Sequence, residues 1–140
     1  MGVALARPAC GDPIRMRTLI LVMLGGAFGT GLRYSLSSLV HLAIKQPKFP
    51  LATFIVNLSG SFLIGLLVEA FASRFPVSPS ARATVLVGVL GGYTTFSSFS
   101  FETFSLIRQG DFWLAALNVS ASVLLGLAAV WAGMRFAQVI

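Results

Sequence analysis

Four long apolar stretches dominate the 140-residue sequence. They cover residues 18–44, 51–68, 83–101 and 112–134, and each contains either no charged side chain or a single one. About 20 helical residues, each rising about 1.5 Å, cross a membrane core about 30 Å thick. The sequence therefore predicts an all-α membrane protein with four transmembrane helices, at residues 18–44, 51–72, 83–107 and 112–136.

The composition excludes a water-soluble domain. Hydrophobic residues make up 56% of the sequence and charged residues 10%, against about 25% charged residues in soluble domains. A soluble helix also needs a repeating polar face, whereas residues 112–134 offer only Asn118, Ser120, Ser122 and a few glycines. The net charge of +6 does not indicate a nucleic-acid ligand, because the basic residues are scattered over chain ends and short loops. We expect them to anchor helix ends at the surface of a lipid bilayer.

The first 16 residues differ from the rest of the chain. Pro8, Gly11 and Pro13 interrupt any helix there, so we expect residues 1–16 to be a disordered leader or a spurious start, followed by a single membrane domain at 17–140. The alternative is a secretory signal whose basic region contains Arg15 and Arg17, which would still leave three spans. Cys10 is the only cysteine, so neither a disulfide nor a cysteine metal site is expected.

The connections between the spans are short. Proline-containing turns follow the first and second spans, and residues 108–111 turn the third, so neighbouring helices should run antiparallel. With Arg7 left out, basic residues divide five to three between the two sides: Arg15, Arg17, Arg74, Arg82 and Arg135 against Lys45, Lys48 and Arg108. This weak bias permits insertion in either orientation, and therefore an antiparallel homodimer.

Small residues recur at helical spacing in three of the spans. Such residues allow close contact between membrane helices, and four helices of this length cannot enclose a pore alone, so the pattern points to an oligomer. The residues are Gly25 with Gly29, Ser61 with Gly65, and Gly126 with Ala129 and Gly133.

The third span contains the most informative segment, Gly-Gly-Tyr-Thr-Thr-Phe-Ser-Ser-Phe-Ser-Phe-Glu at residues 91–102. Two glycines followed by two threonines favour a break in the helix, and freed carbonyls at such a break can ligate a small hard cation such as Na⁺. Seven hydroxyls also fall within twelve residues, which predicts a polar path: Thr94, Thr95, Ser97, Ser98, Ser100, Thr103 and Ser105. The alternative is that these hydroxyls bond back to carbonyls of their own helix.

Aromatic rings lie among these hydroxyls. Phe96 and Phe99 are three residues apart and share a helix face, and ring edges carry partial positive charge that can stabilise an anion. Asn57 adds two amide donors to the second span, where an unpaired polar group is costly. Arg33, Glu102 and Asn118 could serve a vestibule or an accessory function. Both rings could instead be ordinary packing residues, and Asn57 could simply join two helices.

These residues resemble the Fluc (CrcB) family of fluoride channels. The likeness covers residue 16 to the C-terminus and rests on Gly-Gly-Ala-Phe-Gly at 25–29 with Leu32 and Arg33, on Asn-Leu-Ser-Gly at 57–60, and on residues 91–102. It implies a dual-topology homodimer in the inner membrane, with two fluoride pores and a structural central Na⁺ bound by the carbonyls of Gly91 and Thr94. It also implies a passive exporter of cytoplasmic fluoride rather than an enzyme.

The resemblance assigns the pore to Asn57, Phe96, Phe99, Thr95, Ser97, Ser98, Ser100 and Ser122. Asn118 stands where the family has a tyrosine or another hydrogen-bonding residue early in the fourth helix, so the partner of Asn57 is open. Fluoride itself is small, strongly hydrated and a strong hydrogen-bond acceptor, so amide, hydroxyl and ring-edge donors can replace its water.

Two other functions fit a small four-helix membrane protein. A small multidrug exporter exchanges protons for cationic drugs through a carboxylate in its first span, but this first span contains Arg33 and no acid. A non-transporting membrane subunit would dock its polar third helix on a partner. An enzyme is not expected, because the sequence has one histidine, four carboxylates and no extramembrane domain.

Overall fold

The computed structural model of the chain describes residues 13–45 and 47–140. Its secondary structure in these ranges is entirely helical. The elements are α1 (Pro13–Ala43), α2 (Leu51–Ser73), α3 (Pro79–Ala83), the π-helical η1 (Thr84–Val89), α4 (Leu90–Tyr93), α5 (Phe96–Arg108) and α6 (Phe112–Val139). Within the described residues, four helical spans are long and apolar enough to cross a membrane, with α3 to α5 forming the third, which confirms the expected number.

The helix limits differ from the prediction mainly at two N-termini. α1 begins at Pro13 and so includes residues 13–16, which the sequence assigned to the leader, because proline is well tolerated in a first helical turn. Residues 1–12, including Cys10, lie outside the described part of the chain. The third span begins at Pro79 rather than residue 83, with Ser78 capping it by accepting a hydrogen bond from the amide of Ala81.

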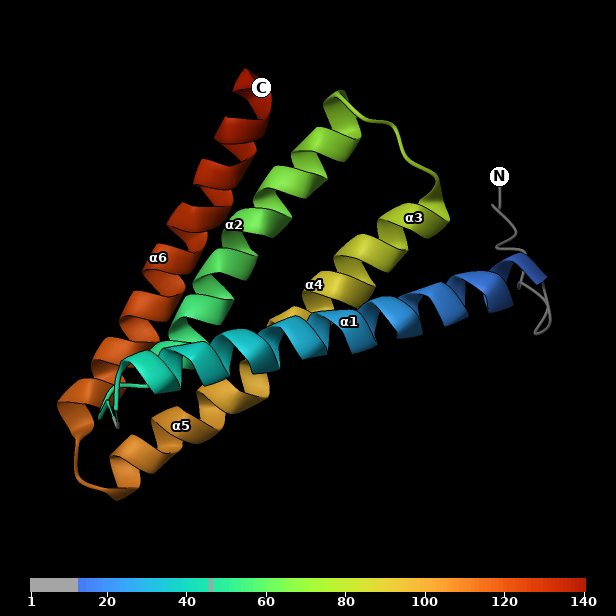
Figure 1. Ribbon diagram of the computed structural model, residues 1–140. Coiled ribbons are helices and arrows are strands. Elements are labelled where there is room, and N and C mark those ends of the chain that lie inside the picture. The colour runs from blue at the N-terminus through green and yellow to red at the C-terminus, as the bar shows by residue number, and fades with distance from the viewer. Residues whose placement is uncertain (1–12, 46) are drawn as a thin grey trace, which may run out of the picture.

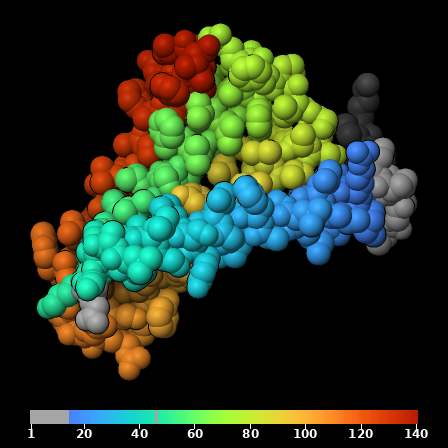
Figure 2. Space-filling view, viewed as in Figure 1, coloured from blue at the N-terminus to red at the C-terminus, as the bar shows by residue number. Residues whose placement is uncertain are grey.

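The spans pack as two helix pairs (Figure 1). α2 and α6 run side by side, and α1 lies along η1 and α4. Side chains fasten each pair at its ends: Arg74 donates to the carbonyl of Gln138 at 3.0 Å, and the hydroxyls of Thr18 and Ser80 share a hydrogen bond of 2.7 Å. Figure 2 shows α1 extending across this face of the molecule, with α5 on one side of it and α2 and α6 on the other.

The expected break in the third span is present, at Thr94 and Thr95. Thr94 has ψ 158° and Thr95 has φ −150° and ψ 116°, so both residues are extended between α4 and α5. Gly91 and Gly92 remain helical, which places the break at the threonines rather than at the glycines. The π-helical turn of η1 was not predicted. The turn between α5 and α6 has Gly110 at φ 82°, a conformation that favours glycine.

The small residues pack helices together within one chain. A Cβ atom on Gly29 would overlap the carbonyl oxygen of Val89, and one on Gly65 would overlap that of Val130. Gly133 is equally tight against the carbonyl of Phe62, whereas Gly126 makes only ordinary contact. Close packing is therefore confirmed at Gly29, Gly65 and Gly133 but not at Gly126. The step from them to an oligomer is not supported, because their partners lie in the same chain.

Candidate ion path at the broken helix

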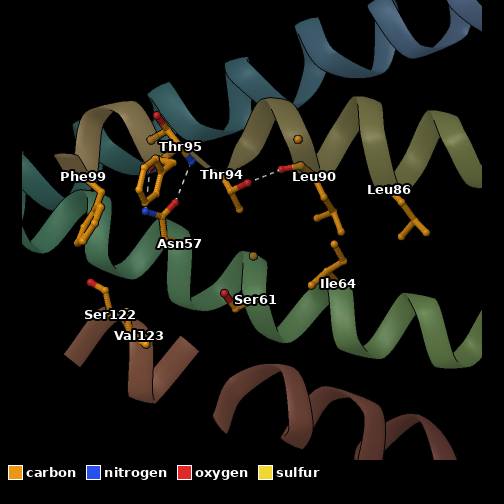
Figure 3. A pocket seen from close by; sticks show the side chains of 13 residues that line it. Asn57, Ser61, Ile64, Leu86, Leu90, Thr94, Thr95, Phe99, Ser122 and Val123 are labelled. Carbon is orange, nitrogen blue, oxygen red and sulfur yellow. Dashed lines mark hydrogen bonds between the residues drawn. The ribbon is translucent and has the colours of Figure 1, made fainter. Parts of the chain in front are cut away.

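A cavity of about 400 Å³ lies beside the break in the third span (Figure 3). It is lined by residues of α2, η1, α4, α5 and α6 and of the break, and each of its 13 lining residues is uncharged. Figure 3 shows Phe99 and Ser122 near one end of the cavity, with Leu86, Leu90 and Ile64 at the other. The expected site residues among the lining are Asn57, Gly91, Thr94, Thr95, Phe96, Phe99 and Ser122.

Asn57 binds the backbone of Thr95 with both ends of its amide. Its Nδ2 donates to the Thr95 carbonyl at 3.0 Å, and its Oδ1 accepts from the Thr95 amide at 2.8 Å. A break inside an apolar span frees backbone groups that must find new partners. Asn57 supplies both partners for Thr95, which answers the question of what Asn57 pairs with.

The threonines and an arginine satisfy other backbone groups near the break. Both the amide and the hydroxyl of Thr94 donate to the carbonyl of Leu90, at 2.9 Å each. The Gly92 carbonyl accepts from Arg33 Nε at 3.2 Å. Among the described residues, no donor bonds the carbonyl oxygen of Gly91 or Thr94. These two oxygens are therefore free to ligate a cation.

The two phenylalanines stand together at the cavity. Their ring centroids are 5.6 Å apart and their planes are tilted by 40°, so the edges of the two rings point in different directions. Phe96 is 78% exposed, and Phe99 is partly buried. A 78% exposed ring is not buried in the core of this chain, so packing within one chain does not explain Phe96.

A second, smaller cavity lies on the other side of Thr95. It has a volume of about 180 Å³, and Thr95 lines both it and the first cavity. Its charged and titratable lining residues are Arg33, His41 and Glu102. A third cavity of about 360 Å³ also includes His41 and Glu102 and extends to Lys48 and Gln109 near the helix ends. The cavities thus form a series from the end of α5 to the break.

Glu102 faces these smaller cavities with half of its carboxylate unpaired. Its Oε1 accepts from the hydroxyl of Thr53 at 2.8 Å, whereas Oε2 is buried and has no hydrogen-bond partner among the described residues. Thr53 was not singled out from the sequence. Its position four residues before Asn57 puts both on one face of α2, which was a usable signal.

The hydroxyl-rich segment divides into several environments. Ser98 lines the second cavity, Ser97 shares a 3.2 Å hydrogen bond with Thr95, and Ser100 is exposed and lines neither the first nor the second cavity. Thr103 and Ser105 donate to carbonyls of their own helix at 2.7 and 2.8 Å. The simple alternative, a bond back to a carbonyl one turn earlier, therefore holds for these two residues and for Thr94.

Asn118 lies away from the cavities. It is 1% exposed, and its Nδ2 donates to Thr103 Oγ1 at 2.8 Å. The sequence also missed Tyr93, whose hydroxyl shares a 2.8 Å hydrogen bond with Ser59 and joins the end of α4 to α2.

Four apolar spans with a polar interruption in the third define a multi-pass α-helical membrane protein. The sequence profile of the family described as "CrcB-like protein, Camphor Resistance (CrcB)" matches residues 20–134. The chain belongs to this CrcB family, as the sequence resemblance predicted.

Three curated relatives are more than 40% identical to this chain over nearly their whole length. The chain is 44% identical over 119 residues to the "Fluoride-specific ion channel FluC" of Solibacter usitatus, covering 85% of this chain and 97% of that protein. The proteins of the same name from Geobacter sulfurreducens and Agrobacterium fabrum are 44% and 45% identical over 123 residues, covering 88% of this chain and 98% of each relative.

Proposed function

We propose that this chain forms a passive fluoride channel that lets cytoplasmic fluoride leave the cell. The observation that carries the proposal is the uncharged cavity at the broken third span, where an asparagine, hydroxyls and two phenylalanine rings converge. The similarity to proteins named fluoride-specific ion channel supports the choice of ion. The proposed activity is conduction down an electrochemical gradient, with no chemical reaction.

The cavity chemistry suits an anion that must be bound weakly enough to leave. Ring edges of Phe96 and Phe99 and the hydroxyl of Ser122 offer partial positive charge without a fixed cation. Arg33 lines only the neighbouring cavity, where its charge can attract anions before they reach Thr95. Fluoride would then exchange its water for these donors as it passes from the second cavity to the first.

A structural Na⁺ at the break belongs to the proposal. The carbonyl oxygens of Gly91 and Thr94 would hold it, since both residues line the cavity and neither oxygen accepts a hydrogen bond among the described residues. Oxygen ligands from unwound backbone suit this ion. Protein purified and reconstituted without Na⁺ should melt at a lower temperature and regain stability on its return. A melting temperature that is the same with and without Na⁺ would contradict a structural Na⁺.

The proposal also includes an antiparallel homodimer with two pores. In a single chain, Phe96 and many large apolar side chains of α1 and α6 are exposed. A second copy of the chain would cover Phe96. The weak charge bias across the membrane allows the two copies to insert in opposite orientations.

The alternative, a proton-coupled exporter, has one observation in its favour: the unpaired Oε2 of Glu102 within the third span. Liposomes that contain the purified protein and are loaded with potassium fluoride separate the two. A channel releases fluoride as soon as valinomycin carries K⁺ out to balance charge, with no pH gradient. An exporter needs a proton gradient. Fluoride release that occurs only with a proton gradient would therefore reject the channel, and so would the absence of any fluoride release.

A further inference from the structure

α5 has few buried side chains and is joined to the other spans by hydrogen bonds. Only two of its side chains, Thr103 and Leu106, are buried, while Phe96, Phe101 and Phe104 are exposed. Three hydrogen-bonded links join this helix and its N-terminal residue to the other spans. They are Asn57 with the Thr95 backbone, Thr53 with Glu102, and Asn118 with Thr103. The first two lie beside the cavities, whereas the third is buried behind them.

Asn118, in the third link, is connected by hydrogen bonds to two residues that line the first cavity, Phe99 and Ser122. Asn118 Nδ2 donates to Thr103 Oγ1 at 2.8 Å, and that hydroxyl donates in turn to the carbonyl of Phe99 at 2.7 Å. On the other side of the amide, the hydroxyl of Ser122 lies 3.5 Å from Asn118 Oδ1. Phe99 and Ser122 both line the first cavity, but Asn118 does not.

We infer that Asn118 is a positioning residue for the anion path. Its amide nitrogen fixes the α5 turn that carries Phe99, and its amide oxygen accepts from the Ser122 hydroxyl when no anion is there to accept from it. This inference rests on the proposed function. Donors in a chain polarise one another, so the Asn118 bond also strengthens the bond from Thr103 to the Phe99 carbonyl. The Ser122 contact is long and therefore weak, so the Ser122 hydroxyl can turn from Asn118 towards a passing anion.

Asn118→Leu keeps the size of the side chain but removes the donor and the acceptor. Thr103 would keep its bond to the Phe99 carbonyl, so no buried donor is stranded and the helix can still form. The tie between α6 and α5 is lost, which frees the Phe99 turn to shift. One hydrogen bond of ordinary net strength corresponds to about a fivefold change in an equilibrium, so we expect fluoride efflux to fall about fivefold or more. Selectivity for fluoride over chloride should fall with it.

The experiment compares four variants in liposomes: Asn118→Leu, Thr103→Val, Thr103→Ser and Ser120→Ala. Thr103→Val removes the hydroxyl that relays the contact, and Thr103→Ser restores it. Ser120 is the matched control on the same helix, because its hydroxyl donates to carbonyls of its own helix and lines none of the three cavities described above. We expect loss of efflux and selectivity for the first two variants, recovery of most of both for Thr103→Ser, and no change for Ser120→Ala.

A double variant gives the sharpest comparison. If Asn118 acts through Thr103, combining Asn118→Leu with Thr103→Val should cost little more than either change alone. Additive losses would overturn the relay. So would native fluoride selectivity in Asn118→Leu, or equal losses in Thr103→Ser and Thr103→Val.

Hydrogen exchange of the peptide 96–108 provides a readout that does not depend on conduction. Exchange at the start of α5 should speed up in Asn118→Leu and Thr103→Val but not in Ser120→Ala. Unchanged exchange in the first two would overturn the positioning inference even if fluoride efflux fell. If the unsubstituted chain conducts no fluoride, the proposed function fails, and exchange alone still decides whether Asn118 orders α5.

Discussion

Replacing Asn57 by leucine should both loosen the break and stop conduction. The two side chains are similar in size, but leucine can neither donate to the Thr95 carbonyl nor accept from the Thr95 amide, bonds that measure 3.0 and 2.8 Å. Each stranded backbone group costs about 1–3 kcal/mol, so two give about 2–6 kcal/mol. Asn57 and Thr95 are only partly buried and the cavity can admit water, which favours the lower end, about 2 kcal/mol.

Asn57→Asp separates stability from conduction. The carboxylate keeps an acceptor for the Thr95 amide and strands only the carbonyl, so it should cost about half as much stability, about 1 kcal/mol. It also places negative charge beside the cavity and should therefore reduce fluoride efflux at least as severely as leucine does. Ser73→Ala is the control, because that hydroxyl on α2 is exposed and bonds only its own helix, to the Glu69 carbonyl.

Thermal unfolding in detergent and fluoride efflux from liposomes measure the two effects. The order of melting temperatures should be unsubstituted chain, Asn57→Asp, then Asn57→Leu, with Ser73→Ala unchanged. If Asn57→Leu melted and conducted like the unsubstituted chain, the pairing of Asn57 with Thr95 would not hold the break, and the reasoning would be refuted.

Three further predictions concern the rings, the packing glycines and the orientation. Phe99→Ile should remove most fluoride efflux from correctly assembled protein because it removes the ring edge while keeping an apolar side chain, and normal efflux would reduce Phe99 to a packing residue. Gly29→Ala should cost about 1–3 kcal/mol in thermal unfolding by overlapping the Val89 carbonyl, whereas Gly31→Ala, with nothing within 4 Å in this chain, should not; equal melting of the two would contradict the packing. A C-terminal tag should be accessible from both sides of the membrane in intact cells, and labelling from one side only would rule out dual topology.

The number of spans and the existence of the break could be read from the sequence. Apolar length sets the number of spans, and Gly-Gly followed by Thr-Thr weakens a helix locally whatever surrounds it. The exact position of the break depends on a partner in another helix, because Asn57 holds Thr95 while Gly91 and Gly92 stay helical. Local sequence does not reveal that partner.

The site was predicted less evenly. Asn57, Phe96, Phe99, Thr95 and Ser122 line one cavity, and their role in an ion path stays a prediction. The partners of individual polar groups were not predictable, since they depend on how α5 and α6 align. Asn118 therefore pairs with Thr103, and Gly29, Gly65 and Gly133 pack against helices of their own chain, so the oligomer stays a prediction.

The reversal potential under a fluoride–chloride gradient tests the central claim most directly. Purified protein in a planar bilayer, with sodium fluoride on one side and sodium chloride on the other, should carry current that reverses far from zero, with the sign expected when fluoride permeates and chloride does not. A reversal potential near zero would mean that fluoride and chloride pass equally well. That result, or a protein that carries no current in fluoride, would contradict a fluoride-selective path along Asn57, Thr95 and the two phenylalanine rings.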